Sequence, residues 1–303
     1  MKQELITVCI TTFQRKTLVG LAVQSVLDQS YSNFELILVD DYSNDGTKEF
    51  IENEILPLDP RIRFIFHDEN KGLSCARNSA IFNARGKYFT FLDDDDEWQQ
   101  DFLAKFYELA ERYPHIPAFT CGTIHGSRKV YSPINGTIKS VIRQGYAPPV
   151  AAQFYLVKTL RAVQGYNPEI KSGVDHDLWL RLSFLDLEIR SLDLCLSKPN
   201  ANVSLDRMTT NVNKRLTGIQ NSLNIWKPDI EEHYDSEFYN DFSKAYISNV
   251  YSCFFINNIK QKDFSEAYKT FVKIDKKVSF LSRHIRRLLS KNSKEYSASA
   301  LDL

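Results

Sequence analysis

The sequence predicts an α/β fold in which helices cover both faces of a parallel sheet. Apolar stretches with the character of strands alternate with stretches of helical spacing over residues 5–112. The strand-like stretches are apolar almost throughout, as expected of strands buried on both faces. Polar residues follow each of them directly, and in such sheets ligands bind outside the carboxyl ends of the strands. We therefore expect one functional edge of the sheet.

Each element is predicted from its local pattern, in chain order. Apolar stretches rich in β-branched or aromatic residues, of the length of strands, occupy residues 5–12, 34–39, 61–66 and 87–92. Apolar residues recur every three or four positions, as in helices, over residues 17–28, 74–84 and 102–112. The turn SNDGT at 43–47 precedes a further helix, for which Thr47 is the expected cap.

The pattern changes in the second half of the chain. Residues 115–170 are less regular and contain several prolines. Residues 173–185 begin polar and continue as an amphipathic helix. After residue 210 the composition shifts towards Asn, Tyr, Lys and Phe, and helices are predicted over residues 217–226, 237–257 and 264–274.

Composition excludes few classes of protein. The 303 residues are 43% apolar and 25% charged with a net charge of zero, so overall charge indicates no nucleic-acid or membrane partner. The five cysteines are scattered, as expected of free thiols in a reducing compartment. No apolar run approaches the ~18 residues needed to cross a bilayer. The N-terminus reads as a first strand rather than a signal peptide, so we expect a cytoplasmic protein.

Four consecutive aspartates, Asp93 to Asp96, follow the fourth predicted strand. A solvated acidic loop is the simplest explanation. However, no Gly or Pro separates them from the strand, so the first members should be partly packed and need a counter-charge. Carboxylates suit Mg²⁺ or Mn²⁺, which commonly bind substrate phosphates as well. Asp93 and Asp95 point the same way in an extended segment and are the predicted metal ligands.

Several motifs resemble, in order and spacing, those of glycosyltransferase family 2. They are ITVCITTFQR at 6–15, VDDYSNDGT at 39–47, NKGLSCARN at 70–78 and FLDDDDEW at 91–98. The resemblance covers residues 4–112 closely and 165–185 less closely. It implies the GT-A fold, a Rossmann-like and mostly parallel central sheet flanked by helices, here with a C-terminal helical extension. The implied domains are a catalytic domain over 1–210, with a nucleotide-binding half (1–112) and an acceptor-binding half (113–210), and the extension over 211–303.

The resemblance also implies roles for single residues. Thr11 would lie near the nucleotide, Asp41 would bind the base, and Arg77 would be the basic residue near the nucleotide. Asp93 would lie near the ribose or the metal, Asp95 would be the best metal ligand, and Asp94 would lie beside the ribose and diphosphate. Asp96 would be a second acid of the motif or the cap of the next helix.

The segment SGVDHDLWLRL at 172–182 resembles the family motif that carries the catalytic base. Asp175 occupies the position of that base, while Val174 replaces the glutamate that usually precedes it. Asp177 is the second candidate, and capping of the helix is the structural alternative for both aspartates. His176 between them is expected to form local hydrogen bonds, with metal binding as the alternative. Gln153 is a further candidate for contact with sugar or acceptor, and a buried strand is expected over the rest of residues 145–158.

Together these features predict an inverting, metal-dependent glycosyltransferase. It would use a nucleotide-sugar donor, UDP-linked, and a glycan or lipid-linked glycan acceptor, in the synthesis of a surface polysaccharide such as a capsule or O-antigen. One alternative is a nucleotidyltransferase, although the Gly-rich phosphate loop that it would need is missing from TTFQRKTLVG at 11–20. The other is a non-catalytic module that binds nucleotide-sugar or glycan and does not need Asp175.

A basic amphipathic stretch lies near the C-terminus. Residues 276–291 combine lysines and arginines with apolar residues at helical spacing. Such a helix either packs on the protein or lies on anionic lipid. The second arrangement would place the enzyme at the inner face of the cell membrane, in contact with a lipid-linked acceptor.

Overall fold

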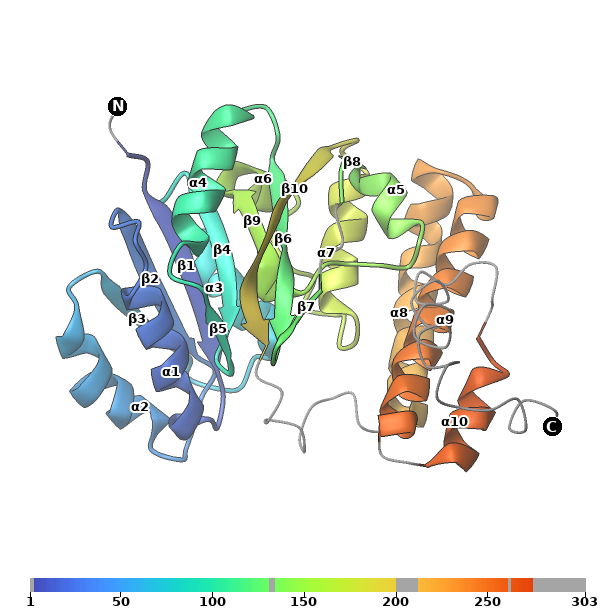
Figure 1. The fold of residues 1–303 in the computed structure, drawn as a ribbon, viewed down its shortest axis with the longest axis horizontal. Coiled ribbons are helices and arrows are strands. Elements are labelled where there is room, and N and C mark those ends of the chain that lie inside the picture. The colour runs from blue at the N-terminus through green and yellow to red at the C-terminus, as the bar shows by residue number, and fades with distance from the viewer. Residues whose placement is uncertain (1–2, 131–133, 200–211, 261–262, 275–303) are drawn as a thin grey trace. The chain divides into compact units, whose positions relative to one another are not determined.

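A computed structural model describes residues 3–130, 134–199, 212–260 and 263–274. The chain divides into two compact units, residues 1–139 with 147–210 and residues 140–146 with 211–303. A ten-stranded sheet forms the centre of the first unit, and helices form the second (Figure 1).

The first unit begins with alternating strands and helices. In order they are β1 (Ile6–Thr12), α1 (Lys16–Leu27), β2 (Phe34–Asp40), α2 (Thr47–Phe50) continued by turns of π- and 3₁₀-helix (Ile51–Ile55, Leu56–Leu58), β3 (Ile62–Phe66), α3 (Leu73–Asn83), β4 (Tyr88–Asp93), β5 (Asp96–Trp98) and α4 (Phe102–Arg112). Thr47 does not cap α2. It is the first residue of that helix, and Asp45 accepts hydrogen bonds from its backbone N–H and its hydroxyl.

Shorter elements complete the first unit. They are β6 (Ala118–His125), β7 (Arg128–Val130), β8 (Gly136–Thr137), a 3₁₀ turn (Val150–Ala152), β9 (Gln153–Leu156), α6 (Val157–Ala162), α7 (Val174–Ser183) and β10 (Glu188–Pro199). The short helix α5 (Ile138–Ile142) begins at the end of the first unit, and its last three residues belong to the second. β9 lies within residues 145–158, where a buried strand is expected from the sequence. The sequence predicts no strand for β5 to β8 or for β10, because most of these are short or lie among prolines and turns.

The sheet has the strand order β3-β2-β1-β4-β9-β6-β10-β5. The strands from β3 to β4 are parallel, and the register sets Thr12 opposite Asp40 and Thr11 opposite Asp93. β9 is antiparallel to both β4 and β6, whereas β10 is parallel to β6. The parallel half that the sequence predicts is therefore confirmed, and β9 makes the sheet mixed.

Alternation along the strands assigns side chains to the two faces of the sheet. Ile6, Val8 and Ile10 point towards the face that α1 and α4 cover, where they join one buried apolar cluster (Figure 1). Cys9 and Thr11 point to the opposite face, on which α3 packs. Each strand is therefore buried on both sides, which explains its nearly continuous apolar sequence.

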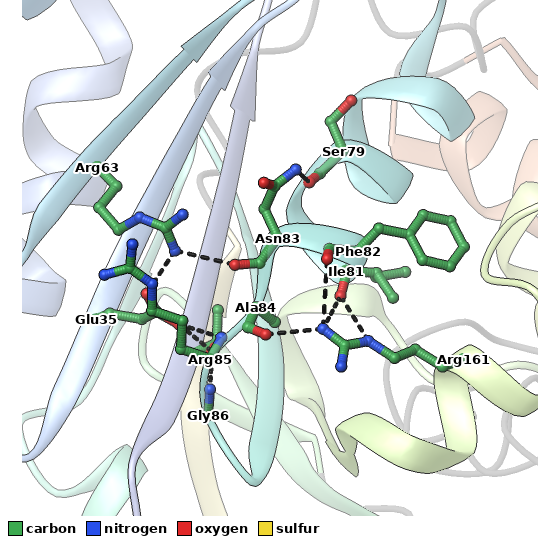
Figure 2. A network of polar contacts seen from close by, with 11 residues as sticks. Glu35, Arg63, Ser79, Ile81, Phe82, Asn83, Ala84, Arg85, Gly86 and Arg161 are labelled. Atoms are coloured by element: carbon green, nitrogen blue, oxygen red, sulfur yellow. Dashed lines mark hydrogen bonds and ion pairs between the residues drawn. The ribbon is translucent and has the colours of Figure 1, made fainter.

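A polar network fixes the edge of the sheet that lies away from the aspartates (Figure 2). The Glu35 carboxylate accepts hydrogen bonds from Thr7 Oγ1 at 2.8 Å, from the Arg85 backbone at 2.6 Å and from Arg63 at 2.7 Å. Gly86 follows directly, and a Cβ there would lie 2.7 Å from the Thr7 nitrogen. The missing side chain of Gly86 lets the chain pass this close to β1.

Arg161 of α6 binds the C-terminal end of α3 in the same network (Figure 2). Its guanidinium donates to the carbonyls of Ile81 at 3.1 Å and Ala84 at 2.7 Å. The last carbonyls of a helix have no partner within it and carry partial negative charge, so an arginine there is favourable. These bonds fix α3, whose other end carries the residues described below.

The second unit contains α8 (Val212–His233), α9 (Ser236–Lys260) and α10 (Phe264–Phe271), coloured orange in Figure 1. Trp226 of α8 contacts the rings of Phe242 and Tyr246 of α9. Asn249 of α9 donates to the carbonyls of Gln144 and Gly145, which belong to the same unit. No helix among the described residues is long and apolar enough to cross a membrane. The basic stretch at 276–291 lies outside the described residues.

Candidate active site

The candidate site lies at the carboxyl ends of β1, β2 and β4. Strand order runs outward from β1 through β2 to β3, and the chain then returns to place β4 on the other side of β1. This reversal is a topological switch point, where open α/β sheets bind ligands. Asp40 and Asp41, Thr11 and Thr12, and the four aspartates therefore come to one edge, as the sequence predicts.

Asp94 joins β1 to the end of β4. Its Oδ2 accepts a hydrogen bond from Thr12 Oγ1 at 2.7 Å, and its Oδ1 accepts one from Arg15 at 2.7 Å. The residue is only 4% exposed, and this burial raises the pKa of Asp94 to about 6 despite the opposing effects of Arg15 and Thr12. Both oxygens are engaged within the protein, and the role of Asp94 beside the nucleotide stays a prediction.

Arg77 of α3 connects two predicted site residues. Its Nη2 lies 3.0 Å from Asp93 Oδ1, and its Nη1 lies 2.9 Å from Asp175 Oδ1. The guanidinium is 3% exposed and lies 5.6 Å from the ring centre of Phe91 and 5.1 Å from that of Tyr166. Charge-assisted hydrogen bonds in such a buried setting are strong. Arg77 thus brings carboxylates from distant parts of the sequence to one cation.

The four aspartates do not form one extended strand. Asp93 ends β4, Asp94 and Asp95 form a turn, and Asp96 begins β5. The turn brings ligand oxygens of Asp93, Asp95 and Asp96 within 4.8 Å of one another, which suits a small divalent cation. The sequence predicts the first two as ligands but assigns Asp96 less definitely. Asp96 does not cap α4, which Asp101 precedes.

The chain itself supplies positive charge around this cluster. Arg15 lies 3.5 Å from Asp95 Oδ2 in addition to its contact with Asp94, and Arg77 contacts Asp93. A bound metal is the counter-charge expected from the sequence. Arg15 is not predicted, because it follows β1 by three residues and has no signal other than its place in the first motif.

Asp41 holds the loop that leads into α3. Its carboxylate accepts hydrogen bonds from the Lys71 backbone at 2.9 Å and the Gly72 backbone at 2.7 Å, and it lies 2.7 Å from His67 Nδ1. An ionised carboxylate offers about four acceptor positions, so most are already used. Binding of a nucleotide base by Asp41 stays a prediction.

Asp175 and Asp177 lie in the first turn of α7 and have different surroundings. The cap residue of α7 is Gly173, so neither side chain caps the helix. Asp177 is 1% exposed and binds Arg181 of its own helix at 2.6 Å. The Asp175 side chain is 32% exposed and faces Arg77. Asp175 thus contacts another predicted site residue, Arg77, and it also accepts a hydrogen bond from Tyr166.

The structure also places the weaker candidates. Gln153 is fully buried, and its amide binds the Pro148 carbonyl and the Tyr155 hydroxyl, each at 2.6 Å. Phe13 and Tyr42, which follow β1 and β2, are exposed aromatic residues at the functional edge that the sequence argument did not consider. Their exposure could not be read from a sequence in which most aromatic residues are buried.

Comparison with known proteins identifies the domain. Residues 7–144 match the model of glycosyl transferase family 2. The chain carries a glycosyltransferase family 2 domain. The chain is 39% identical over 105 residues to TuaG of Bacillus subtilis, a putative teichuronic acid biosynthesis glycosyltransferase. The aligned segment is 35% of this chain and 41% of TuaG. The chain is also 44% identical over 103 residues to WcaA of Escherichia coli, a putative colanic acid biosynthesis glycosyl transferase, and this segment is 34% of this chain and 36% of WcaA. The matched segment thus spans less than half of these relatives.

Solved structures show the fold of the chain. S. aureus TarS, residues 1–349 in complex with UDP-GlcNAc, aligns with a TM-score of 0.67 at 17% identity over 90% of this chain and 82% of that one. The mannosyltransferase PcManGT from Pyrobaculum calidifontis, in complex with GDP-Man and Mn²⁺, aligns with a TM-score of 0.60 at 14% identity over 98% of this chain and 77% of that one. The predicted GT-A fold is confirmed by this likeness.

Proposed function

We propose that the chain is an inverting, metal-dependent glycosyltransferase that moves a sugar from a UDP-linked donor to a hydroxyl of a glycan or lipid-linked glycan. One observation carries this proposal. The guanidinium of Arg77 contacts Asp93 on one side and Asp175 on the other. The acidic cluster that suits a metal and diphosphate therefore adjoins the carboxylate that suits a base.

The donor side of the site is the β4–β5 turn. Asp93, Asp95 and Asp96 would hold Mn²⁺ or Mg²⁺, because their oxygens converge and oxygen donors are the ligands that these ions prefer. Such an ion acts as a Lewis acid that stabilises negative charge on a departing diphosphate. Arg15 and Arg77 add fixed positive charge beside the same carboxylates. Thr11 and Asp41 are the proposed contacts of the nucleoside.

The acceptor side of the site is Asp175. Its Oδ1 accepts hydrogen bonds from Arg77 and Tyr166, whereas its Oδ2 accepts none from the described residues. The side chain is partly exposed, so Oδ2 can accept the proton of an acceptor hydroxyl. Attack by that hydroxyl on the face of the sugar opposite the diphosphate inverts the anomeric centre. Val174 is largely buried at the start of α7 and offers no polar contact to the acceptor.

The names of relatives support the choice of donor and acceptor. The E. coli protein WfaP, 41% identical over 95 residues, is named a UDP-Glc:alpha-D-GlcNAc-diphosphoundecaprenol beta-1,3-glucosyltransferase. A Campylobacter jejuni relative, 34% identical over 113 residues, is named for a diphosphoundecaprenol-linked glycan. A UDP-linked donor and a lipid-linked acceptor at the inner membrane face are therefore our proposal for this chain, in the synthesis of a surface polysaccharide.

Release of free nucleotide from a panel of nucleotide sugars tests the proposal. We expect UDP release with Mn²⁺ and an acceptor glycan, and loss of that release with a chelator. Asp175→Asn and Asp95→Ala should each lower the rate by at least about 1000-fold. Asp59→Asn is the matched control, because Asp59 also pairs with an arginine, Arg61, but lies outside the site.

The outcomes separate the alternatives. A nucleotidyltransferase would instead join a nucleotide to a sugar phosphate and release pyrophosphate. A non-catalytic module would bind the donor without turnover. Full activity of folded Asp175→Asn would show that Asp175 is not the base. Full activity of the metal-free enzyme would show that no metal is required.

A further inference from the structure

Tyr166 is fixed to α3 through its backbone. The Asn78 side chain accepts a hydrogen bond from the Tyr166 N–H at 2.7 Å and donates one to the Tyr166 carbonyl at 2.8 Å. The preceding Gly165 has φ +68°, and a Cβ there would lie 2.2 Å from Asn78 Oδ1. Only glycine therefore permits this approach. The amide of one helix residue thus holds both polar backbone groups of Tyr166.

The ring of Tyr166 is held as firmly as its backbone. It packs edge-on against Phe91 with 5.5 Å between ring centres, and the Arg77 guanidinium lies over its face. The residue is 1% exposed, and this burial raises the pKa of Tyr166 well above its ordinary value. The phenol therefore stays protonated and can donate a hydrogen bond.

The hydroxyl of Tyr166 lies 3.4 Å from Asp175 Oδ1, the oxygen that also accepts from Arg77. This separation is longer than the usual 2.5–3.0 Å for an O–H···O bond. Hydrogen bonds of catalytic groups are often long before substrate binds and shorten in the complex. Arg77 and Asn78 are adjacent on α3, so this helix holds the base once directly and once through Tyr166.

We propose that Tyr166 is a positioning residue that, with Arg77, fixes Asp175 Oδ1 so that Oδ2 faces the acceptor. This inference rests on the proposed glycosyl transfer. In that step the acceptor oxygen forms a bond to the anomeric carbon and its proton goes to Asp175 Oδ2. The bond from that carbon to the diphosphate breaks, and its electron pair leaves with the diphosphate. A carboxylate free to rotate would meet the hydroxyl in the required geometry less often.

Tyr166→Phe tests the role because it removes one oxygen and keeps the ring. We expect kcat for transfer to fall about 10-fold, the value of one hydrogen bond to a charged group. KM for donor and for acceptor should stay within about twofold, since Tyr166 contacts neither in this assignment. If Tyr166 only supported the fold, the variant would have a lower thermal stability but an unchanged kcat.

Tyr88→Phe is the matched control. Tyr88 is also 1% exposed, and its hydroxyl donates to a carboxylate, Glu111, at 3.1 Å, but it begins β4 at the end away from the aspartates. We expect wild-type kcat for this variant. Should Tyr166→Phe fail to fold, Asn78→Ala keeps the phenol while it releases the backbone of Tyr166, and kcat should again fall with KM unchanged.

The outcomes distinguish this inference from the proposed function. Wild-type kcat in folded Tyr166→Phe, or in folded Asn78→Ala, overturns the positioning role while Asp175→Asn still tests the base. A wild-type protein that transfers no sugar from any donor overturns both.

Discussion

At the scale of single residues, the site is organised around two arginines that lie on different faces of the sheet. Arg15 contacts Asp94 and Asp95 from the end of β1, next to α1, and Arg77 contacts Asp93 and Asp175 from α3. Thr11 and Thr12 at the end of β1 point to opposite faces, and Asp93 pairs with Thr11 in the sheet whereas Asp94 binds Thr12. This explains why Asp93 meets Arg77 and Asp94 meets Arg15. The adjacent like charges are tolerated because two arginines lie among them, with Arg15 shared by Asp94 and Asp95.

Replacement of Arg77 by lysine should be far from conservative. Arg77 binds Asp175 and Asp93 through two different nitrogens, Nη1 and Nη2, whereas a lysine carries all its donors on one nitrogen and lacks this planar fork. We expect kcat/KM for transfer to fall by about 100-fold, in line with the loss of two charge-assisted hydrogen bonds. Steady-state kinetics on Arg77→Lys, with Arg61→Lys as a control at the Asp59 pair outside the site, measures this. Equal kcat/KM in the two variants would contradict the bridging role.

At this scale the sequence shows which residues are candidates for the site better than it shows which residues contact one another. The acidic run and the aspartate of VDHDL can be read from pattern and resemblance. Tyr166 has no such signal, because its role depends on the fold of α6 and on the Asn78 amide many positions earlier. The same limit applies to Asp96, which becomes a candidate ligand only because Asp94 and Asp95 form a turn.

At the scale of elements, the loop between β3 and α3 depends on one carboxylate. Asp41 follows β2 and accepts hydrogen bonds from the backbone of Lys71 and Gly72, directly before α3 begins. His67 binds Asp41 at the start of the loop and Ser79 of α3 on its other side, with both separations below 3 Å. The position of α3, and with it Arg77, is thus linked to the end of β2.

Asp41→Ala should loosen this loop before it unfolds the domain. It leaves two backbone N–H groups without their acceptor, and each such loss costs about 1–3 kcal/mol when the group is buried. We expect the free energy of unfolding to fall by about 2 kcal/mol, because the loop is only partly buried. Urea denaturation gives the free energy, and hydrogen exchange should be faster at Lys71 and Gly72. Unchanged exchange at these two amides would show that Asp41 does not hold the loop.

Elements with long, regular patterns are predictable, and those that depend on neighbouring strands are not. The sequence locates β1, β2, β4, α1 and α4 to within a residue or two because each carries a complete period of apolar residues. It misses β10, which becomes a strand because it fits between β6 and β5. It also ends α8 before Pro228, although the helix continues through that proline to His233.

At the scale of the whole molecule, the proposed ligands all belong to one unit. The acidic cluster, Arg77 and Asp175 lie in residues 1–139 and 147–210, and the helices of the second unit contribute none of them. Nucleotide and metal should therefore stabilise the first unit by mass action, since they bind its folded state alone. We propose that the chain divides into a catalytic domain and a helical extension. Stabilisation of the first unit alone by bound ligand would test this division.

UDP with Mn²⁺ should raise the melting temperature of the first unit. A ligand at 100 times its Kd adds about 2.7 kcal/mol to the free energy of unfolding. For a unit of this size that corresponds to a shift of about 5–10 °C. The shift should vanish in Asp95→Ala and shrink when either UDP or Mn²⁺ is given alone, because carboxylates and phosphates share the ion. Differential scanning calorimetry measures it, with the Asp59→Asn variant as a control that keeps the wild-type response. An equal shift with UDP in a chelator would mean that nucleotide binds without the metal, and the acidic turn would then have another purpose.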